Sequence, residues 1–340
     1  MPPLPGQVRA AVFGAKSYDR QSLDAANADF DHELTYFEPR LDQTTAALAT
    51  GFRVVCAFVN DILDERVLTI LHGSGTQIVA LRCAGYNNVD LSAAARLGII
   101  VVRVPAYSPH AVAEYTIGLV LALDRNIHRA WARVRDNNFA LDGFVGRNLY
   151  GRTVGVIGTG RIGALVAHSF AQGFGCKVLA SDIAPHPALT AAGVSYLEAG
   201  DVLAQADIIT LHCPLTPLTR HIINADVIAR AMPGVMIVNT SRGALIDTVA
   251  LIDGLKSRKI GSVALDVYEQ EADLFFEDLS NEIIADDVFQ RLLTFPNVLI
   301  TGHQAFLTQE ALAAIAHTTL QNIADASAGR PLANQLEATL

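Results

Sequence analysis

Short apolar runs alternate with amphipathic stretches over the first hundred residues of the chain. The apolar runs are four to six residues long, as strands are, and lie at 8–13, 34–37, 54–59, 78–82 and 99–102. The stretches between them have the spacing of amphipathic helices, at 17–30, 43–48, 64–71 and 91–97. This β-α-β rhythm predicts a parallel sheet covered by helices on both faces.

The rhythm is interrupted at 104–109, where two prolines are typical of a linker. A long helix is predicted at 111–136 and a last helix at 308–324. Between them lie further predicted strands, at 154–157, 177–182, 207–211, 235–239, 263–266 and 298–301. An acidic insertion at 269–287 is interpreted as a surface excursion without an assigned chemistry.

The strand at 154–157 runs directly into a glycine-rich turn, Gly158-x-Gly160-x-x-Gly163, which opens an amphipathic helix. In this pattern the first glycine permits a tight turn, the second lets a pyrophosphate approach the backbone, and the third lets the helix pack close to the strand. The N-terminus of the helix offers N–H groups to the phosphates. An ordinary strand-to-helix turn would explain the glycines alone. However, the next strand ends in Asp182, 19 residues after Gly163, where an acid can bind the adenosine ribose. We therefore expect an NAD site.

Length and composition exclude several classes of protein. A chain of 340 residues predicts two domains, and 51% hydrophobic residues describe a globular protein. A formal net charge of −9 argues against a surface for nucleic acid or anionic membrane. Four cysteines without C-x-x-C spacing suggest neither a zinc site nor disulfides, and no metal is expected. There is no signal-peptide pattern and no apolar run long enough to span a membrane, so we expect a cytoplasmic protein.

An NAD site makes hydride transfer the default chemistry, and three residues just past predicted strands suit it. Arg242 could grip a carboxylate through its planar fork of donors. His303 could pass a proton near neutral pH, and Glu271 could orient the ring and stabilise its charged form. The carboxyl ends of parallel strands converge on the cofactor crevice, but the sequence pattern does not show that these three side chains meet.

Motifs spread over nearly the whole chain resemble those of the D-isomer-specific 2-hydroxyacid dehydrogenases, and within them the fermentative D-lactate dehydrogenases. The spacings of 29 residues from Arg242 to Glu271 and of 32 from Glu271 to His303 match the triad of that family. The segments 274–278 and 303–306 resemble the lactate branch in particular. The other motifs that carry the resemblance are at 81–90, 102–107, 158–163, 211–216, 238–243 and 265–271.

The resemblance implies a role for each residue of the site. Arg242 would bind the carboxylate of a 2-oxo acid, His303 would protonate its carbonyl oxygen, and Glu271 would pair with His303. The backbone N–H groups of Ala84 and Gly85 would hold the carboxylate near the Tyr107 hydroxyl, and Phe306 would wall the substrate's short side chain. Asp266 and the Cys213 carbonyl would hold the nicotinamide carboxamide. The full set expected to bind the cofactor is Gly158, Thr159, Gly160, Arg161, Ile162, Gly163, Asp182, Cys213, Asn239, Thr240 and Asp266.

The resemblance also implies the fold, which is α/β with two doubly wound parallel-sheet domains. A Rossmann NAD domain, 104–301, would be inserted into a flavodoxin-like substrate domain built from 1–103 and 302–340, with a cleft between them. The expected activity is NAD-dependent reduction of pyruvate to D-lactate in a homo-oligomer, a dimer or tetramer. One alternative is a dehydrogenase for larger 2-oxo acids such as phenylpyruvate. The other is an NAD-sensing binding protein resembling a corepressor, because a fold does not determine a function.

Overall fold

The computed structural model describes residues 8–338, which divide into two compact units. Unit 1 holds the described residues up to Ser108 together with those from Leu307 onward, and unit 2 is Pro109–Phe306. Both divisions lie five residues beyond the predicted boundaries, at 108 against 103 and at 306 against 301. Unit 1 is therefore discontinuous in sequence.

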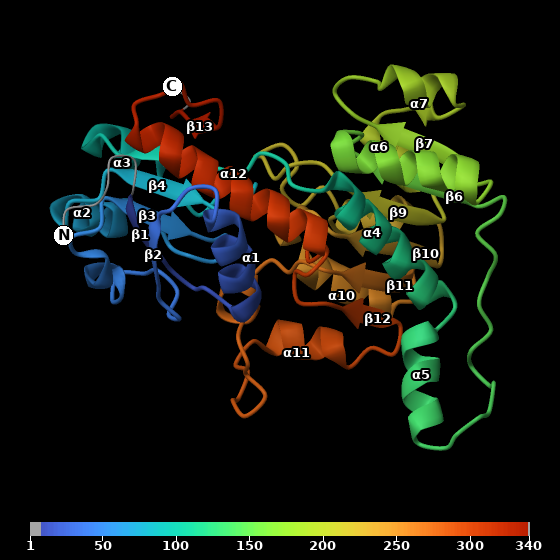
Figure 1. Cartoon of the computed structure of the whole chain (residues 1–340). Coiled ribbons are helices and arrows are strands. Elements are labelled where there is room, and N and C mark those ends of the chain that lie inside the picture. The colour runs from blue at the N-terminus through green and yellow to red at the C-terminus, as the bar shows by residue number, and fades with distance from the viewer. Residues whose placement is uncertain (1–7, 339–340) are drawn as a thin grey trace. The chain divides into compact units, whose positions relative to one another are not determined.

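Unit 1 is built on a six-stranded sheet with the strand order β13-β5-β4-β3-β1-β2 (Figure 1). The five strands predicted from the sequence are parallel, as expected, and the short strand β13, which was not predicted, runs antiparallel to β5. The segment predicted as a helix at 43–48 is instead a short 3₁₀ helix, η1. The elements of unit 1 are β1 (Arg9–Val12), α1 (Ser17–Asn27), β2 (Glu33–Tyr36), η1 (Ala46–Ala49), β3 (Val54–Ala57), α2 (Glu65–Gly73), β4 (Ile78–Leu81), α3 (Leu91–Leu97), β5 (Ile100–Val102), α12 (Gln309–Ser327) and β13 (Gln335–Leu336).

Helix α12 joins unit 1 although about two hundred residues separate it from β5. Its residues Leu320 and Ile323 are fully buried and share a core with Val54 and Cys56 of β3. The side chain of Asn322, also on α12, donates to the Arg103 carbonyl over 2.8 Å. Burial of these apolar side chains favours docking of the helix by about 1.5–3 kcal/mol for each large one.

Unit 2 is built on a seven-stranded parallel sheet with the order β12-β11-β10-β9-β6-β7-β8 (Figure 1). Helices α4 and α6 share the apolar core on one face, and α8, α9 and α10 share the core on the other. Its elements are α4 (Pro109–Asp124), α5 (Ile127–Arg135), β6 (Thr153–Ile157), α6 (Arg161–His168), a π-helical turn η2 (Ser169–Gly173), β7 (Lys177–Ser181), α7 (Pro187–Ala191), β8 (Ser195–Tyr196), α8 (Ala199–Gln205), β9 (Ile208–Leu211), α9 (Ala225–Arg230), β10 (Val235–Asn239), η3 (Gly243–Leu245), α10 (Thr248–Lys256), β11 (Ile260–Leu265), η4 (Glu271–Asp273), α11 (Asp287–Leu293) and β12 (Val298–Ile300).

The helix predicted at 111–136 is two helices in the structure. Asn126, between α4 and α5, has a φ of 53° in the left-handed region, where a helix cannot continue and which asparagine tolerates better than most residues. Eight residues of helix α4 are buried, whereas no residue of α5 is buried. The continuous helical spacing of the sequence concealed this break.

Among the residues of the acidic insertion at 269–287 whose burial is described, only Phe275 is buried, so the segment is a surface excursion that is anchored at this residue. Phe275 is 7% exposed and packs in the same core as Phe289, with ring centroids 6.0 Å apart. The ring of Phe276 lies 5.6 Å from that of His303. This part of the insertion therefore contributes to the core of unit 2 and to the surroundings of a candidate catalytic residue.

Candidate active site

Six neighbouring strands of unit 2 end at one line across the sheet. Their pairing places one residue from each strand in register, namely Ser181, Ile157, Leu211, Asn239, Leu265 and Ile300, in the order β7, β6, β9, β10, β11 and β12. The predicted cofactor and catalytic residues of this unit follow at that line or within a few residues of it. The carboxyl edge of the sheet thus brings the predicted residues of unit 2 to one side, which is where ligands bind in open α/β sheets.

The glycine-rich turn after β6 is shaped by close packing. Gly158 has a φ of +91°, and a Cβ there would lie 2.6 Å from the Cys213 nitrogen. A Cβ at Gly163 would lie 1.9 Å from the Gly158 carbonyl oxygen, so α6 approaches β6 as the pattern predicts. A Cβ at Gly160 would meet no atom within 4 Å. The open side of the turn is therefore at Gly160, where a pyrophosphate could approach the backbone.

Asp182 closes the turn from the end of β7. Its Oδ2 accepts hydrogen bonds from the Thr159 backbone N–H and from the Thr159 hydroxyl, the latter over 3.2 Å. The Tyr196 hydroxyl in turn donates to Thr159 Oγ1 over 2.9 Å. Within residues 8–338, Asp182 Oδ1 has only a 3.4 Å contact with the Ala184 N–H, so it can still accept from a ribose hydroxyl. Sequence reasoning missed Tyr196 because β8 has only two residues and no readable pattern.

We expect NADH to be preferred to NADPH by at least tenfold in kcat/KM, because the Asp182 carboxylate would accept from a ribose and repel a 2′-phosphate. A hydrogen bond to a charged group is worth about 1.5–3 kcal/mol, which corresponds to about a tenfold or larger change in kcat/KM. Asp182→Asn should lower the ratio of kcat/KM with NADH to kcat/KM with NADPH. Asp201→Asn, on the exposed surface of α8, should leave it unchanged. Equal efficiencies with both cofactors in the wild type would contradict this assignment.

His303 and Glu271 form a hydrogen-bonded pair. The distance from His303 Nδ1 to Glu271 Oε1 is 2.8 Å, and both side chains are mostly buried, at 16% and 20% exposed. The other oxygen of Glu271 accepts from the Tyr268 N–H over 2.9 Å, which fixes the carboxylate. Because Nδ1 faces Glu271, Nε2 is the ring nitrogen left for proton transfer to a ligand.

Asp266 organises the loop that carries His303. Its buried carboxylate accepts from the Thr301 hydroxyl over 2.6 Å and from the N–H groups of Gln304 and Ala305 over 2.9 and 2.8 Å. Its carbonyl accepts from the His303 N–H over 2.7 Å. Burial raises the pKa of Asp266. His303 itself has a φ of +53°, an unfavourable conformation for a residue other than glycine, and these bonds hold it there.

Arg242 lies in the loop after β10, next to the segment that carries Glu271. A Cβ at Gly243 would lie 2.0 Å from the Tyr268 carbonyl carbon, so the two backbones are in contact. The guanidinium of Arg242 donates to the Ser241 carbonyl over 2.7 Å. The Ser241 hydroxyl donates to the Cys213 carbonyl over 2.8 Å, which links the loops after β9 and β10. A carbonyl oxygen has two lone pairs, so Cys213 can still accept from another group.

The side chains of Asn239 and Thr240 are engaged within unit 2. The Asn239 amide donates to the Arg242 carbonyl over 2.8 Å and its oxygen accepts from the Ser241 N–H over 3.0 Å. The hydroxyls of Thr240 and Thr116 lie 2.8 Å apart. Both predicted residues therefore shape the loop after β10. Arg161 and Ile162 lie in the first turn of α6, directly after Gly160.

His212, between β9 and Cys213, was not singled out from the sequence. A Cβ at Gly163 would lie 3.2 Å from the His212 Cβ, so the residue packs beneath the glycine-rich turn. Its Nε2 is buried and has no hydrogen-bond partner among residues 8–338. Burial lowers the pKa of His212 to about 4, which keeps the ring neutral at neutral pH. Burial likewise raises the pKa of the Cys213 thiol to about 11.

The predicted residues Ala84, Gly85 and Tyr107 belong to unit 1, whereas Phe306 is the last residue of unit 2 and is 7% exposed. Ala84 and Gly85 follow the end of β4, and in the described part of the chain no acceptor takes either backbone N–H. The Ala84 carbonyl accepts from Arg103 over 2.8 Å. Such a loop can receive an anion.

The start of this unit 1 loop is held by a buried ion pair that the sequence did not reveal. The Arg82 guanidinium is 1% exposed, and its Nε lies 3.2 Å from Asp19 Oδ1 on α1. Its Nη2 donates to the Gly14 carbonyl over 3.0 Å. Removing one partner of such a pair would leave a buried charge uncompensated.

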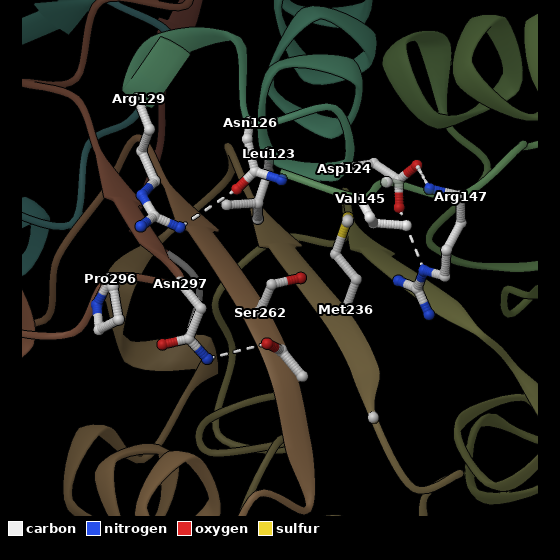
Figure 2. Close-up of a pocket in the computed structure, with 13 residues that line it drawn as sticks. Leu123, Asp124, Asn126, Arg129, Val145, Arg147, Met236, Ser262, Pro296 and Asn297 are labelled. Atoms are coloured by element: carbon white, nitrogen blue, oxygen red, sulfur yellow. Dashed lines mark hydrogen bonds and ion pairs between the residues drawn. The ribbon is translucent and has the colours of Figure 1, made fainter. Parts of the chain in front are cut away.

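A cavity of about 350 Å³ lies elsewhere in unit 2 (Figure 2). It is lined by residues at the amino-terminal ends of β10, β11 and β12, including Met236, Ser262 and Asn297, and by the end of α4. Asp124 and Arg147 form an ion pair of 3.2 Å at its rim. None of the predicted site residues lines this cavity. It lies at the opposite edge of the sheet from the chemistry described above.

Residues 117–305 match the family model described as D-isomer specific 2-hydroxyacid dehydrogenase, NAD binding domain. The chain belongs to this family. The dehydrogenase is 54% identical over 318 residues to 2-hydroxyacid dehydrogenase homolog 1 of Schizosaccharomyces pombe, covering 94% of this chain and 96% of the relative. It is 51% identical over 329 residues to the D-lactate dehydrogenase of Escherichia coli, covering 97% and 100%.

Among solved structures, the pyruvate reductase of Chlamydomonas reinhardtii has a TM-score of 0.90 and 45% identity, covering 97% of this chain and 99% of that one. The predicted family, the α/β fold with two sheets and the NAD cofactor are thereby confirmed. The protein is an NAD-dependent D-2-hydroxyacid dehydrogenase. In the described residues no helix is long and apolar enough to cross a membrane, and no cluster of His, Cys, Asp and Glu could hold a metal ion.

Proposed function

We propose that the dehydrogenase reduces pyruvate to D-lactate with NADH. The observation that carries this proposal is the Glu271–His303 pair of 2.8 Å, placed one loop from Arg242 at the carboxyl edge of the NAD-binding sheet. A carboxylate-binding arginine beside a histidine proton donor suits a 2-oxo acid. The names of the Escherichia coli and Chlamydomonas reinhardtii relatives support pyruvate as that acid.

In the proposed mechanism each residue performs one task. The glycine-rich turn and Asp182 would hold the dinucleotide, which supplies the hydride to the carbonyl carbon when bound. The fork of Arg242 binds the substrate carboxylate and polarises the carbonyl. His303 Nε2 donates the proton that the carbonyl oxygen needs, and Glu271 stabilises the imidazolium from which it comes. Oxidation of lactate reverses these transfers and starts from the neutral ring.

We assign unit 2 as the NAD domain and unit 1 as the substrate domain. The glycine-rich turn, Asp182 and Asp266 lie in unit 2. The available N–H groups of Ala84 and Gly85, which support carboxylate binding, lie in unit 1. Four free cysteines are consistent with a reducing cytoplasm as the location.

The substrate assignment predicts that pyruvate is turned over with a higher kcat/KM than phenylpyruvate and that the product is D-lactate. We assign Tyr107 and the buried Phe306 to the wall around the substrate methyl group. Phe306→Ala should therefore lower the ratio of kcat/KM for pyruvate to kcat/KM for phenylpyruvate. Contacts of one methylene are worth only about 1–3 kcal/mol, so small acids should differ modestly. The measurement is NADH oxidation across a panel of 2-oxo acids, with chiral analysis of the products.

Phe174→Ala, at a half-buried phenylalanine elsewhere in unit 2, is the matched control and should leave the ranking unchanged. A wild-type preference for phenylpyruvate would replace this proposal with the dehydrogenase for larger acids. NADH binding without turnover of any 2-oxo acid would favour the NAD-sensing binding protein instead.

We further propose that the dehydrogenase is a homo-oligomer joined through α5 and the segment that follows it. Helix α5 buries no residue, and helices this short are marginal in water without a partner. Exposed large apolar side chains gather here, at Ile127, Trp131, Val134, Phe139, Leu141 and Val145. Residues 125–147 contain five Arg and two Asp, a net charge of +3, so the rest of the chain, with −9 overall, carries −12. A second copy therefore offers both apolar and oppositely charged surface.

Trp131→Glu should shift the protein to monomers, because it places a charge on an apolar surface that is 65% exposed. Light scattering coupled to size exclusion measures the mass directly. Val249→Glu makes the same kind of change at a side chain that is 60% exposed on α10 and should leave the mass unchanged. A wild-type protein that is monomeric at micromolar concentration would refute the proposal.

A further inference from the structure

A second glutamate lies close to the proposed catalytic pair. Glu269 precedes Glu271 by two residues, and its side chain is 20% exposed. Its Oε1 accepts from Arg220 Nη2 over 3.0 Å and lies 2.8 Å from His221 Nε2. Glu269 is thus engaged by two adjacent residues of the segment after β9, whereas Glu271 is engaged by His303.

The segment that carries Arg220 and His221 is fixed against the loop of Arg242. The His221 N–H donates to the Ala244 carbonyl over 2.9 Å, and the Ile223 N–H donates to the Leu245 carbonyl over 3.1 Å. His221 has a φ of +52°, so its backbone is held in an unfavourable conformation that directs the ring to Glu269. The loop of Arg242 therefore lies against the His221 segment through these bonds and against the Glu269 segment through Gly243.

This arrangement affects which carboxylates can pair with the Arg242 guanidinium. Within residues 8–338 no acidic side chain lies within ion-pairing distance of its guanidinium, whose hydrogen bond is to the Ser241 carbonyl. The backbone at Gly243 touches that of Tyr268 and Glu269, so a Glu269 side chain released from its partners could reach Arg242. A carboxylate paired with the arginine fork would occupy the donors that a substrate carboxylate needs.

We propose that Arg220 and His221 are positioning residues that hold Glu269 away from Arg242 and so keep the arginine fork free for the substrate. Together they engage a carboxylate that would otherwise compete with the substrate's own. The inference rests on the proposed function, because it takes Arg242 as the group that binds the substrate carboxylate.

The test is a rescue experiment on the full-length enzyme. Arg220→Ala combined with His221→Asn removes both partners of Glu269, and asparagine tolerates the left-handed backbone at 221. We expect the KM for pyruvate to rise by roughly tenfold, which corresponds to about 1.4 kcal/mol, with little change in kcat or in the KM for NADH. Adding Glu269→Gln removes the competing charge and should return the KM for pyruvate toward the wild-type value.

The rescue separates this role from a merely structural one. If Glu269, Arg220 and His221 only held their two segments together, adding Glu269→Gln would weaken that contact further and could not restore the KM for pyruvate. Arg152→Ala is the control, because Arg152 pairs with Asp207 over 3.3 Å beside the first residue of β6, at the opposite edge of the sheet. It should leave the KM for pyruvate unchanged.

Two outcomes would overturn the inference: an unchanged KM in the double variant, or a raised KM that Glu269→Gln does not reverse. An Arg242→Lys enzyme with normal efficiency would instead remove the proposed function on which the inference rests. If Arg242→Lys is impaired and only the rescue fails, the error lies in the role of Arg220 and His221 alone.

Discussion

His303→Asn will lower kcat for pyruvate reduction by roughly 10²–10⁴-fold, the usual contribution of a positioned general acid. The substitution removes the only ring nitrogen that Glu271 leaves available for proton donation. Asparagine is chosen because residue 303 has a φ of +53°, which asparagine adopts more readily than alanine. The loss should therefore report on chemistry and not on the loop. Single-turnover reduction at saturating NADH measures it.

His168→Asn, at an exposed histidine on α6, is the control and should leave kcat within about a factor of two.

Glu271→Gln tests whether the charge of Glu271 assists proton donation by His303. It keeps a side chain that can hydrogen bond to His303 Nδ1 but removes the charge that favours the protonated ring. In single-turnover reduction at saturating NADH, kcat of this variant should fall below that of the wild type but stay above that of His303→Asn. An unchanged kcat while chemistry limits the rate would show that Glu271 is not the charge partner.

Arg242→Lys will lower kcat/KM for pyruvate by at least about tenfold. Lysine keeps the positive charge but not the planar fork, so the substrate carboxylate would be held by one point contact in place of two parallel hydrogen bonds. A lost hydrogen bond to a charged group costs about 1.5–3 kcal/mol, which sets the expected size. The efficiency is measured by initial rates of NADH oxidation over a range of pyruvate concentrations.

The same substitution at Arg230, which is exposed at the end of α9, should have no effect on the efficiency. The KM for NADH should be unchanged in both variants, because Arg242 is assigned to the acid and not to the dinucleotide. Unchanged efficiency toward pyruvate in Arg242→Lys would exclude this residue from the carboxylate site.

The periodicity of the sequence predicted most of the elements because strands and helices bury their apolar faces at different spacings. The strands of both units were found within a few residues of their predicted positions, apart from the two-residue strands β8 and β13, which are too short to show a period. Where local pattern and local conformation disagreed, the prediction was wrong. Helical spacing continues through Asn126, but a left-handed residue there separates α4 from α5.

The acidic insertion at 269–287 shows that average composition does not predict the burial of individual residues. Its charges suggested a surface position, yet Phe275 is buried and the ring of Phe276 lies beside that of His303. A few aromatic side chains can anchor a segment whose average composition is polar. Composition averages over residues, whereas packing depends on the individual ones.

The sequence by itself determined the phosphate turn and the cofactor, because glycines at fixed spacing and an acid at the end of the next strand are local requirements of dinucleotide binding. It also identified Arg242, Glu271 and His303 as candidates, since each follows a strand. Only the tertiary structure decided that Glu271 reaches His303 across 32 residues of chain, and that Arg220 and His221 reach Glu269 across about fifty. Such contacts depend on the in-register alignment of parallel strands, and strand order and register are set by the packing of the whole sheet.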